Sequence, residues 1–176
     1  MKINERFIWA LTTLNHKPTD HLLEIGCGSG ILAELIAARL TTGKITAIDQ
    51  SAAAIRMAVK RNERFINSGH SDFIQENFAK TKLSLQHYDK VLSFNLNVFW
   101  KDPRKELQLI RDYLVPDSGL FYLFHQAPYD ISIAAADPLK VMLNQHSFEI
   151  VNVIFGKLHP LSAICIIAKP LSWQSH

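Results

Sequence analysis

The residues best suited to chemistry lie in the stretch HLLEIGCGSG at positions 21–30, where Gly26, Gly28 and Gly30 alternate with other residues. A short apolar run precedes the glycines, and a helix-like run over residues 31–40 follows them. This pattern is typical of a buried parallel strand that turns directly into a helix. Glycine accepts positive φ and has no side chain, so the turn brings bare backbone and a helix N-terminus to a ligand. We therefore expect an elongated polar ligand to lie across this turn.

The spacing of the glycines separates two classes of ligand. The dinucleotide fingerprint G-x-G-x-x-G, counted from Gly26, requires glycine at position 31, where this chain has Ile31. The segment from Glu24 to Gly30 resembles instead the E-x-G-x-G-x-G first motif of the class I S-adenosylmethionine-dependent methyltransferases. A pyrophosphate is anionic and favours a helix dipole, whereas this cofactor carries a sulfonium and an ammonium and favours a nearby carboxylate. We expect Glu24 to supply that carboxylate; the alternative is a strand-end acid that faces solvent or caps a turn.

A second acid, Asp49, ends the strand expected over residues 44–48. It lies about 20 residues beyond the glycine turn, where doubly wound folds meet a ribose diol. The resemblance implies that Asp49 binds the cofactor ribose and that Gln50 flanks the adenine. Because NAD-binding folds place an acid similarly, Asp49 alone indicates only nucleoside binding.

The third and fourth strands, expected over residues 71–75 and 88–93, are each followed by candidate cofactor contacts. Asn77 stands where related methyltransferases carry Asp, and we expect its amide oxygen to accept a hydrogen bond from the adenine amino group. Phe78 packs on the adenine ring or belongs to the core. Asn95 lies near the methionine end of the cofactor or stabilises a turn. The resemblance thus implies a cofactor site made of Glu24, Gly26, Cys27, Gly28, Gly30, Asp49, Gln50, Asn77, Phe78 and Asn95.

Methyl transfer from a sulfonium is an in-line displacement, so the enzyme mainly aligns and desolvates the nucleophile. His125 and Tyr129 lie beyond the strand expected over residues 120–124, at the sheet edge where α/β folds bind ligands. Either side chain is a candidate to orient the nucleophile or take its proton, and a structural role is the alternative for His125. The chain lacks the N-P-P-Y or D-P-P-Y loop of DNA-adenine and glutamine methyltransferases, which counts against those substrates. Because the chain has almost nothing beyond the core fold, we expect the acceptor to be a small molecule or an exposed group on a larger one. No H-E-x-x-H or paired C-x-x-C motif is present, and no metal is expected.

Hydrophobic periodicity places these residues on a doubly wound α/β fold. Helices are expected over residues 3–14, 31–40, 52–65 and 137–144, with another that has Asp102 as N-cap and Pro103 in its first turn. Two strands at 148–155 and 163–168 suit the hairpin that closes the methyltransferase sheet. The expected architecture is a three-layer sandwich around a seven-stranded, mostly parallel sheet whose last strand is antiparallel, the Rossmann-like methyltransferase fold.

Composition favours one globular domain over residues 1–176, with an N-terminal helix in residues 1–19 and a core over 20–169. The net charge is only +3, and Arg56, Lys60, Arg61 and Arg64 fall at helical spacing. A solvated helix face is therefore expected rather than a phosphate-binding patch, and no nucleic-acid partner is predicted. Two cysteines make no disulfide framework, and neither terminus has the length or flanks of a signal peptide or membrane span. We expect a cytoplasmic protein.

Two other functions remain open. One is a catalytically silent module that binds S-adenosylmethionine, and the other is a nicotinamide-dependent oxidoreductase. The intact glycines, Glu24 and Asp49 argue against a loss of cofactor binding, and the Ile31 position argues against a dinucleotide.

Overall fold

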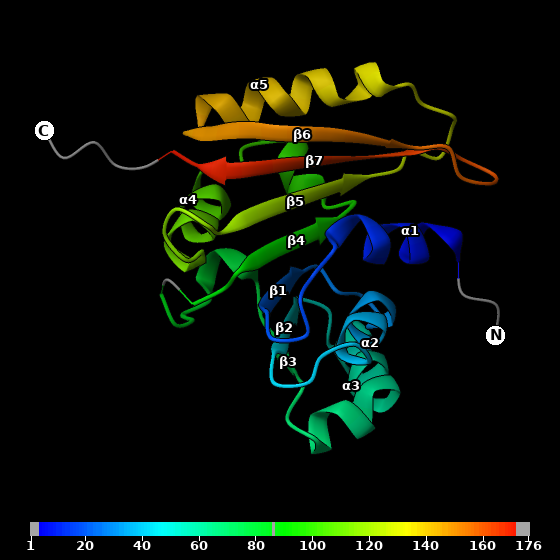
Figure 1. The fold of residues 1–176 in the computed structure, drawn as a ribbon, viewed down its shortest axis with the longest axis vertical. Coiled ribbons are helices and arrows are strands. Elements are labelled where there is room, and N and C mark those ends of the chain that lie inside the picture. Colours follow the sequence, from blue (N-terminus) through cyan, green and yellow to red (C-terminus); the bar gives the residue numbers. More distant parts are fainter. Residues whose placement is uncertain (1–3, 86, 172–176) are drawn as a thin grey trace, which may run out of the picture.

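A single sheet of seven strands forms the centre of the molecule (Figure 1). The computed structural model describes residues 4–85 and 87–171. In chain order the strands are β1 (His21–Ile25), β2 (Lys44–Asp49), β3 (Ser71–Gln75), β4 (Lys90–Phe94), β5 (Leu120–His125), β6 (Phe148–Gly156) and β7 (Ala163–Pro170). Their order across the sheet is β3-β2-β1-β4-β5-β7-β6.

The first five strands are parallel and the final pair closes one edge. β7 runs antiparallel to both β5 and β6, because only a short loop separates β6 from β7 along the chain. The predicted seven-stranded sheet with an antiparallel last strand is confirmed.

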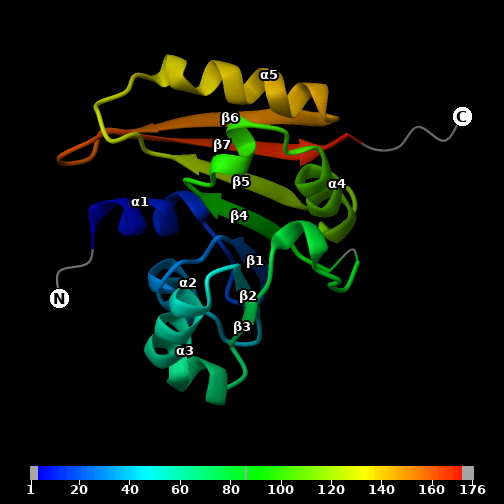
Figure 2. The ribbon, with the colours of Figure 1, turned by 180° about the vertical axis from the view of Figure 1, so that it is seen from behind.

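Helices cover both faces of the sheet (Figures 1 and 2). They are α1 (Glu5–Leu14), α2 (Ile31–Ala37), α3 (Ala52–Asn67), α4 (Arg104–Tyr113) and α5 (Asp137–Gln145), with short 3₁₀ turns η1 (Phe78–Lys80), η2 (Asn97–Trp100) and η3 (Ile133–Ala136). One core cluster joins the sheet to α4 and α5, and a second joins it to α1, α2 and α3. The predicted three-layer sandwich is therefore confirmed.

Local signals set most element boundaries, with several corrections. Helix α2 ends at Ala37 rather than at residue 40, and β5 extends to His125, which was expected to follow it. Ser51 caps α3 as expected, accepting a hydrogen bond from the Ala54 amide at 3.3 Å. The N-cap of α4 is Pro103 rather than Asp102, whose Oδ1 instead accepts from the Arg104 amide at 3.4 Å. β4 begins at Lys90 and not at residue 88, because Tyr88 makes only an isolated bridge to Leu114. Residue 3, expected to begin the first helix, lies outside the described residues.

The strand order reverses between β1 and β4. From β1 the chain first builds outward through β2 and β3, and β4 then starts the other half of the sheet. Loops leave the carboxyl ends of β1 and β4 in opposite directions at such a switch point, and a crevice opens between them.

Candidate functional site

The glycine turn that follows β1 is hydrogen-bonded within the chain. The amides of Gly26 and Cys27 both donate to the Ile48 carbonyl, at 2.8 and 3.0 Å. The Gly28 amide donates to Asp49 Oδ2 at 2.9 Å, and the Gly30 amide donates to the Cys27 carbonyl at 3.0 Å. Because these donors already have partners, the turn is not the ring of free amides that binds a pyrophosphate.

Each glycine of the turn has a different reason to lack a side chain. All three have positive φ, at 77°, 53° and 72° for Gly26, Gly28 and Gly30. A Cβ on Gly26 would lie 2.8 Å from Leu96 Cδ2, and one on Gly30 would lie 2.9 Å from Ala58 Cβ. A Cβ on Gly28 would meet no atom within 4 Å. Gly26 and Gly30 therefore allow close packing of the chain on itself, whereas Gly28 faces open space.

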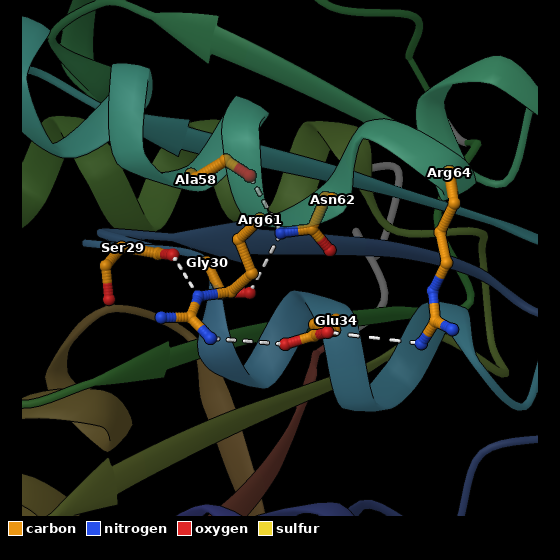
Figure 3. A network of polar contacts seen from close by, with 7 residues as sticks. All are labelled: Ser29, Gly30, Glu34, Ala58, Arg61, Asn62 and Arg64. Carbon is orange, nitrogen blue, oxygen red and sulfur yellow. Dashed lines mark hydrogen bonds and ion pairs between the residues drawn. The ribbon is translucent and has the colours of Figure 1, made fainter. Parts of the chain in front are cut away.

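Helix α3 supports the turn from outside (Figure 3). Arg61 Nε donates to the Ser29 carbonyl at 3.0 Å, and its Nη1 lies 3.4 Å from Glu34 Oε2. Asn62, which is fully buried, donates from Nδ2 to the carbonyls of Gly30 at 3.1 Å and Ala58 at 2.9 Å. The expectation that Arg61 belongs to a solvated face is wrong, because its guanidinium pairs with the turn and α2.

A cavity of about 340 Å³ opens at the strand-order reversal, and we call it the switch-point cavity. It is lined by Ile25, Gly26, Ile48, Asp49, Gln50, Glu76, Asn77, Phe78, Asn95, Leu96, Asn97, Val98 and Glu106. These residues come from the carboxyl ends of β1 to β4, the loops that follow them, and the first turn of α4. Its volume is in the range of small-molecule sites.

The lining combines an apolar slot with negative charge. Ile25, Ile48 and Phe78 provide apolar surface, and Asp49, Glu76 and Glu106 provide three carboxyl groups. No Lys, Arg or His occurs among the described residues that line this cavity. Such a site suits a ligand with a flat apolar ring, hydroxyl groups and positive charge, and it disfavours phosphate.

Asp49 is fixed by two backbone donors before any ligand binds. Its Oδ2 accepts from the Gly28 amide at 2.9 Å and its Oδ1 accepts from the Ser51 amide at 2.8 Å. A carboxylate oxygen has more than one acceptor site, so each oxygen can still accept a hydroxyl proton. This geometry is suited to a ribose diol.

Glu24 lies beneath the turn and does not line the switch-point cavity. It is 3% exposed, and among the described residues no hydrogen-bond partner reaches its Oε2. Burial, and next the negative charge of Asp49, raise the pKa of Glu24 to about 8. The neighbouring Cys27 is also buried, and burial followed by the charges of Glu24 and Asp49 raises the pKa of its thiol well above the usual value.

The polar candidates beyond β3 and β4 already have partners within the chain. The amide oxygen of Asn77 caps η1 by accepting from the Ala79 amide at 2.9 Å. Asn95 Oδ1 accepts from the Gln126 amide at 2.7 Å, and its Nδ2 donates to the Gln126 carbonyl at 2.9 Å. Phe78 is 7% exposed and packs edge-on against Tyr113, so it contributes both to the core and to the cavity wall.

A second cavity of about 420 Å³ lies at the end of β5, and we call it the β5-end cavity. It is lined by Asn95, Asn97, Trp100, His125, Gln126, Ala127, Pro128 and Tyr129. The two cavities share Asn95 and Asn97, so they are neighbours separated by the segment after β4. Burial lowers the pKa of His125, whose ring centroid is 4.9 Å from that of Trp100.

The structure therefore divides the predicted site residues into three groups. Gly26, Asp49, Gln50, Asn77, Phe78 and Asn95 meet at the switch-point cavity. His125 and Tyr129 meet at the β5-end cavity. Glu24, Cys27, Gly28 and Gly30 line neither cavity. Sequence reasoning missed the two acids Glu76 and Glu106 in this lining, and also Leu96, whose proximity to Gly26 is visible only in three dimensions.

Residues 4–85 and 87–171 contain neither a metal cluster nor a membrane-spanning helix. No group of three or more His, Cys, Asp or Glu side chains within this part of the chain is placed to hold a metal ion. None of the helices described there is long and apolar enough to span a bilayer.

Comparisons with known proteins agree with this geometry. Residues 22–117 match the family described as a methyltransferase domain. Over 165 residues the chain is 24% identical to the uncharacterized methyltransferase YdaC of Bacillus subtilis (strain 168), covering 92% of this chain and 89% of that protein. Over 171 residues it is 25% identical to an O-methyltransferase of Pyrenophora dematioidea, covering 88% of this chain but only 63% of that protein. The fold is similar to a SAM-dependent methyltransferase from Aquifex aeolicus, with a TM-score of 0.74, 13% identity, and 92% and 88% of the two chains covered.

Proposed function

The chain belongs to the methyltransferase domain family, and from this premise we propose that it binds S-adenosylmethionine in the switch-point cavity and transfers the methyl group to a small-molecule acceptor. The expected resemblance to class I methyltransferases is confirmed by the family match. When bound, S-adenosylmethionine supplies a methyl group on a positively charged sulfur that is already a good leaving group. The protein's task is then to align the nucleophile for in-line displacement and to exclude water.

The observation that carries this proposal is the charge of the cavity. Three carboxyl groups line it, and no cationic side chain occurs in its described lining. A pyrophosphate would be repelled there, and the amides of Gly26, Cys27, Gly28 and Gly30 are already bonded to Ile48, Asp49 and Cys27. A ligand that carries a sulfonium and an ammonium is stabilised by the same charges. This argues against the nicotinamide-dependent oxidoreductase considered from the sequence.

The residues present fit the cofactor in three parts. The apolar slot of Ile25, Ile48 and Phe78 suits the adenine ring, and Asp49 suits the ribose diol. The open space above Gly28, where a side-chain carbon would meet no atom within 4 Å, leaves room for the remainder of the ligand. Glu24 is buried and does not line this cavity, so it is not among the residues that fit the cofactor directly.

Two further parts of the proposal concern the acceptor and the compartment. The relative from Pyrenophora dematioidea is named an O-methyltransferase, which supports an oxygen acceptor. The two cysteines are free and buried, which fits the reducing cytoplasm expected from the sequence.

A silent binding module is the competing function. Labelled-methyl transfer into cell-extract fractions distinguishes an active methyltransferase from such a module.

A thermal-shift comparison tests the cofactor directly. We expect S-adenosylhomocysteine to raise the Tm in a concentration-dependent way, because a ligand that binds only the folded state stabilises it. NAD and NADP should leave the Tm unchanged. Stabilisation by NAD or NADP alone would contradict the proposal.

Asp49→Ala provides the residue-level test. The variant loses a charged acceptor for the ribose hydroxyls, a contact worth about 1.5–3 kcal/mol, so we expect a rise in Kd for S-adenosylhomocysteine of roughly 10- to 100-fold by calorimetry. The matched control is Asp72→Ala, which removes an exposed acid on β3 that lies outside both cavities. Equal Kd values for Asp49→Ala and the control would show that the ribose is bound elsewhere.

A further inference from the structure

The β5-end cavity adjoins the switch-point cavity. Asn95 and Asn97 line both cavities, so the segment after β4 that carries them forms the wall at whose rim the two cavities meet. The wall is fixed because the Asn95 side chain makes two hydrogen bonds to the backbone of Gln126, at 2.7 and 2.9 Å. Both polar atoms of the Asn95 side chain, Oδ1 and Nδ2, therefore hold this wall in place.

The loop that forms the far side of the β5-end cavity is also anchored. Gln126 Nε2 donates to the Leu161 carbonyl at 2.7 Å, and Asp130 Oδ1 accepts from the Ser162 amide at 3.1 Å. These bonds tie residues 126–130 to the loop between β6 and β7. The cavity is therefore largely formed before an acceptor binds.

The lining of the β5-end cavity selects against charge. It consists of aromatic rings, amides, Ala127, Pro128 and one imidazole, and no Asp, Glu, Lys or Arg occurs among the described residues that line it. A phosphate or carboxylate on the acceptor would lose hydration without gaining a cationic partner. Trp100 and Tyr129 are large aromatic side chains that are 46% and 67% exposed. Their faces suit a planar, uncharged ring.

His125 is the group in this lining that can take a proton. The amides are not bases, and Tyr129 offers a hydroxyl. No hydrogen bond to the His125 ring is found among the described residues, which leaves its nitrogens free apart from the edge contact with Trp100. Tyr129 is the other titratable side chain in the lining. The 3₁₀ turn η2 contributes no titratable side chain, and the residue paired with His125 on the neighbouring strand β7 is Ile164. Burial lowers the pKa of His125, so the imidazole is neutral at pH 7.

We propose that the β5-end cavity binds an uncharged aromatic compound with a hydroxyl group, and that His125 accepts the hydroxyl proton during transfer. This inference rests on the proposed function of the neighbouring cavity. The acceptor oxygen forms a bond to the methyl carbon while the carbon–sulfur bond breaks and its electron pair stays on sulfur. The hydroxyl proton moves to His125, and the imidazolium then releases it to solvent. A hydroxyl needs this help because its neutral form is a weak nucleophile.

Binding to the protein saturated with S-adenosylhomocysteine tests the acceptor class. The probes are 2-naphthol, 2-naphthyl phosphate and 2-naphthoate, which share one ring system and differ in charge. We expect calorimetry to give a Kd for 2-naphthol at least about tenfold lower than for either anion, because the anions lose hydration without a partner. We also expect Trp100→Ala to weaken 2-naphthol binding and leave the Kd for S-adenosylhomocysteine unchanged. Failure of 2-naphthol to bind, or equally tight binding of an anion, overturns the acceptor class.

His125→Gln tests the proton transfer, with His146→Gln on the C-terminal side of α5 as the control outside both cavities. Loss of a general base should lower kcat for labelled-methyl transfer to 2-naphthol by about 100-fold or more, and His146→Gln should match the wild type. The wild-type rate should fall as the pH drops through the lowered pKa of His125, and this limb should be absent in His125→Gln. With 4-nitrophenol at saturating concentration and pH 8, where this phenol is largely ionised and needs no base, the kcat of the variant should match that of the wild type, although the KM for this anion should be high for both.

The outcomes separate this inference from the proposed function. If wild-type protein does not bind S-adenosylhomocysteine, the proposed function fails and the inference fails with it. If it binds both S-adenosylhomocysteine and 2-naphthol but His125→Gln loses equal activity on the two phenols, or loses none, then His125 is not the proton acceptor. If 2-naphthol binds without being methylated, the β5-end cavity is not the acceptor site.

Discussion

The carboxyl of Glu24 lies in surroundings that oppose its ionisation. Its side chain is 3% exposed, and its Oε2 has no hydrogen-bond partner among the described residues. Burial and the nearby charge of Asp49 raise its pKa from 4.5 to about 8, against a smaller opposing effect of a hydrogen bond from the Ala33 backbone. Glu24 therefore links folding to pH. A cation bound above the turn would favour the ionised form.

Glu24→Gln tests this link between ionisation and folding. Between pH 4.5 and 8 the folded chain holds the Glu24 proton and the unfolded chain does not, so the free energy of unfolding falls as the pH rises. This contribution is complete below pH 4.5 and lost by pH 8. The variant keeps the shape without the charge, so urea unfolding should show it gaining stability over the wild type by about 1 kcal/mol per pH unit across this window. Glu63→Gln, an exposed change on α3, should follow the wild type at every pH.

The strand-end positions of the site were predictable, and the partners of its amides were not. Asp49 and Asn95 directly end or follow parallel strands, which places them at one edge of the sheet whatever the loops do. The partner of Asn95 is Gln126, 31 residues away, and no local pattern indicates it. Glu24 and Ile25 are adjacent on β1 and face opposite sides of the sheet, and of these two only Ile25 lines the switch-point cavity.

At the scale of elements, α3 is attached to the glycine turn through polar side chains (Figure 3). Arg61 reaches the Ser29 carbonyl and Asn62 reaches the Gly30 carbonyl, so two successive carbonyls of the turn are held by one turn of α3. Gly30 also allows α3 to pack closely, because a Cβ there would lie 2.9 Å from Ala58. The orientation of α3 therefore determines the shape of the turn that faces the ligand.

Arg61→Met, compared with Arg64→Met, tests this attachment. Both substitutions remove a positive charge from α3, but only Arg61 bonds to the turn, and Arg64 is 70% exposed with a 4.0 Å contact to Glu34. Loss of a charged hydrogen bond should destabilise the turn by about 1.5–3 kcal/mol, and we expect a rise of several-fold in the Kd for S-adenosylhomocysteine. The Arg64 variant should bind like the wild type. Indistinguishable Kd values for the two variants would show that the turn keeps its shape without Arg61.

The order and type of the elements were readable from periodicity, but their polar connections were not. Each strand and helix expected from the sequence is present, with boundaries displaced where turns and caps differ from the simplest pattern. Arg61 was assigned to solvent because basic residues at helical spacing usually face water. Its partner at Ser29 is 32 residues away, and only the packing of α3 against the turn brings the two together.

At the scale of the whole molecule, the end of the sheet opposite the cavities is cross-linked by charge. Lys90 Nζ at the start of β4 lies 2.8 Å from Asp20 Oδ2, just before β1, and both side chains are nearly buried, at 11% and 7% exposure. Lys90 Nζ also donates to the Asn15 carbonyl at 3.3 Å, and Asp20 Oδ2 accepts from the Lys17 amide at 2.9 Å. The pair joins the two strands between which the cavity opens at their other ends.

The sheet thus has a stabilising end and a binding end, and only the binding end was predictable from the sequence. The binding end is marked by glycines and strand-end acids, whereas Asp20 and Lys90 are 70 residues apart and each looks like an ordinary surface charge. Their pairing depends on β1 and β4 being neighbours, which is a property of the sheet order. Long-range contacts of this kind become predictable only after the topology is known.

Lys90→Met should destabilise the fold and leave cofactor binding intact. Removing the ammonium leaves Asp20 buried without its cation, which costs about 3–5 kcal/mol, whereas Lys169→Met breaks an exposed pair with Glu149 and should cost less than about 1 kcal/mol. Urea unfolding measures the free energy of unfolding of both variants.

The double variant Asp20→Asn, Lys90→Met should be more stable than Lys90→Met alone, because it removes the unpaired buried charge. Folded Lys90→Met should bind S-adenosylhomocysteine with a Kd within about twofold of the wild type, since the change lies at the far ends of the strands. Equal stabilities for Lys90→Met and Lys169→Met would show that the buried pair does not stabilise the sheet.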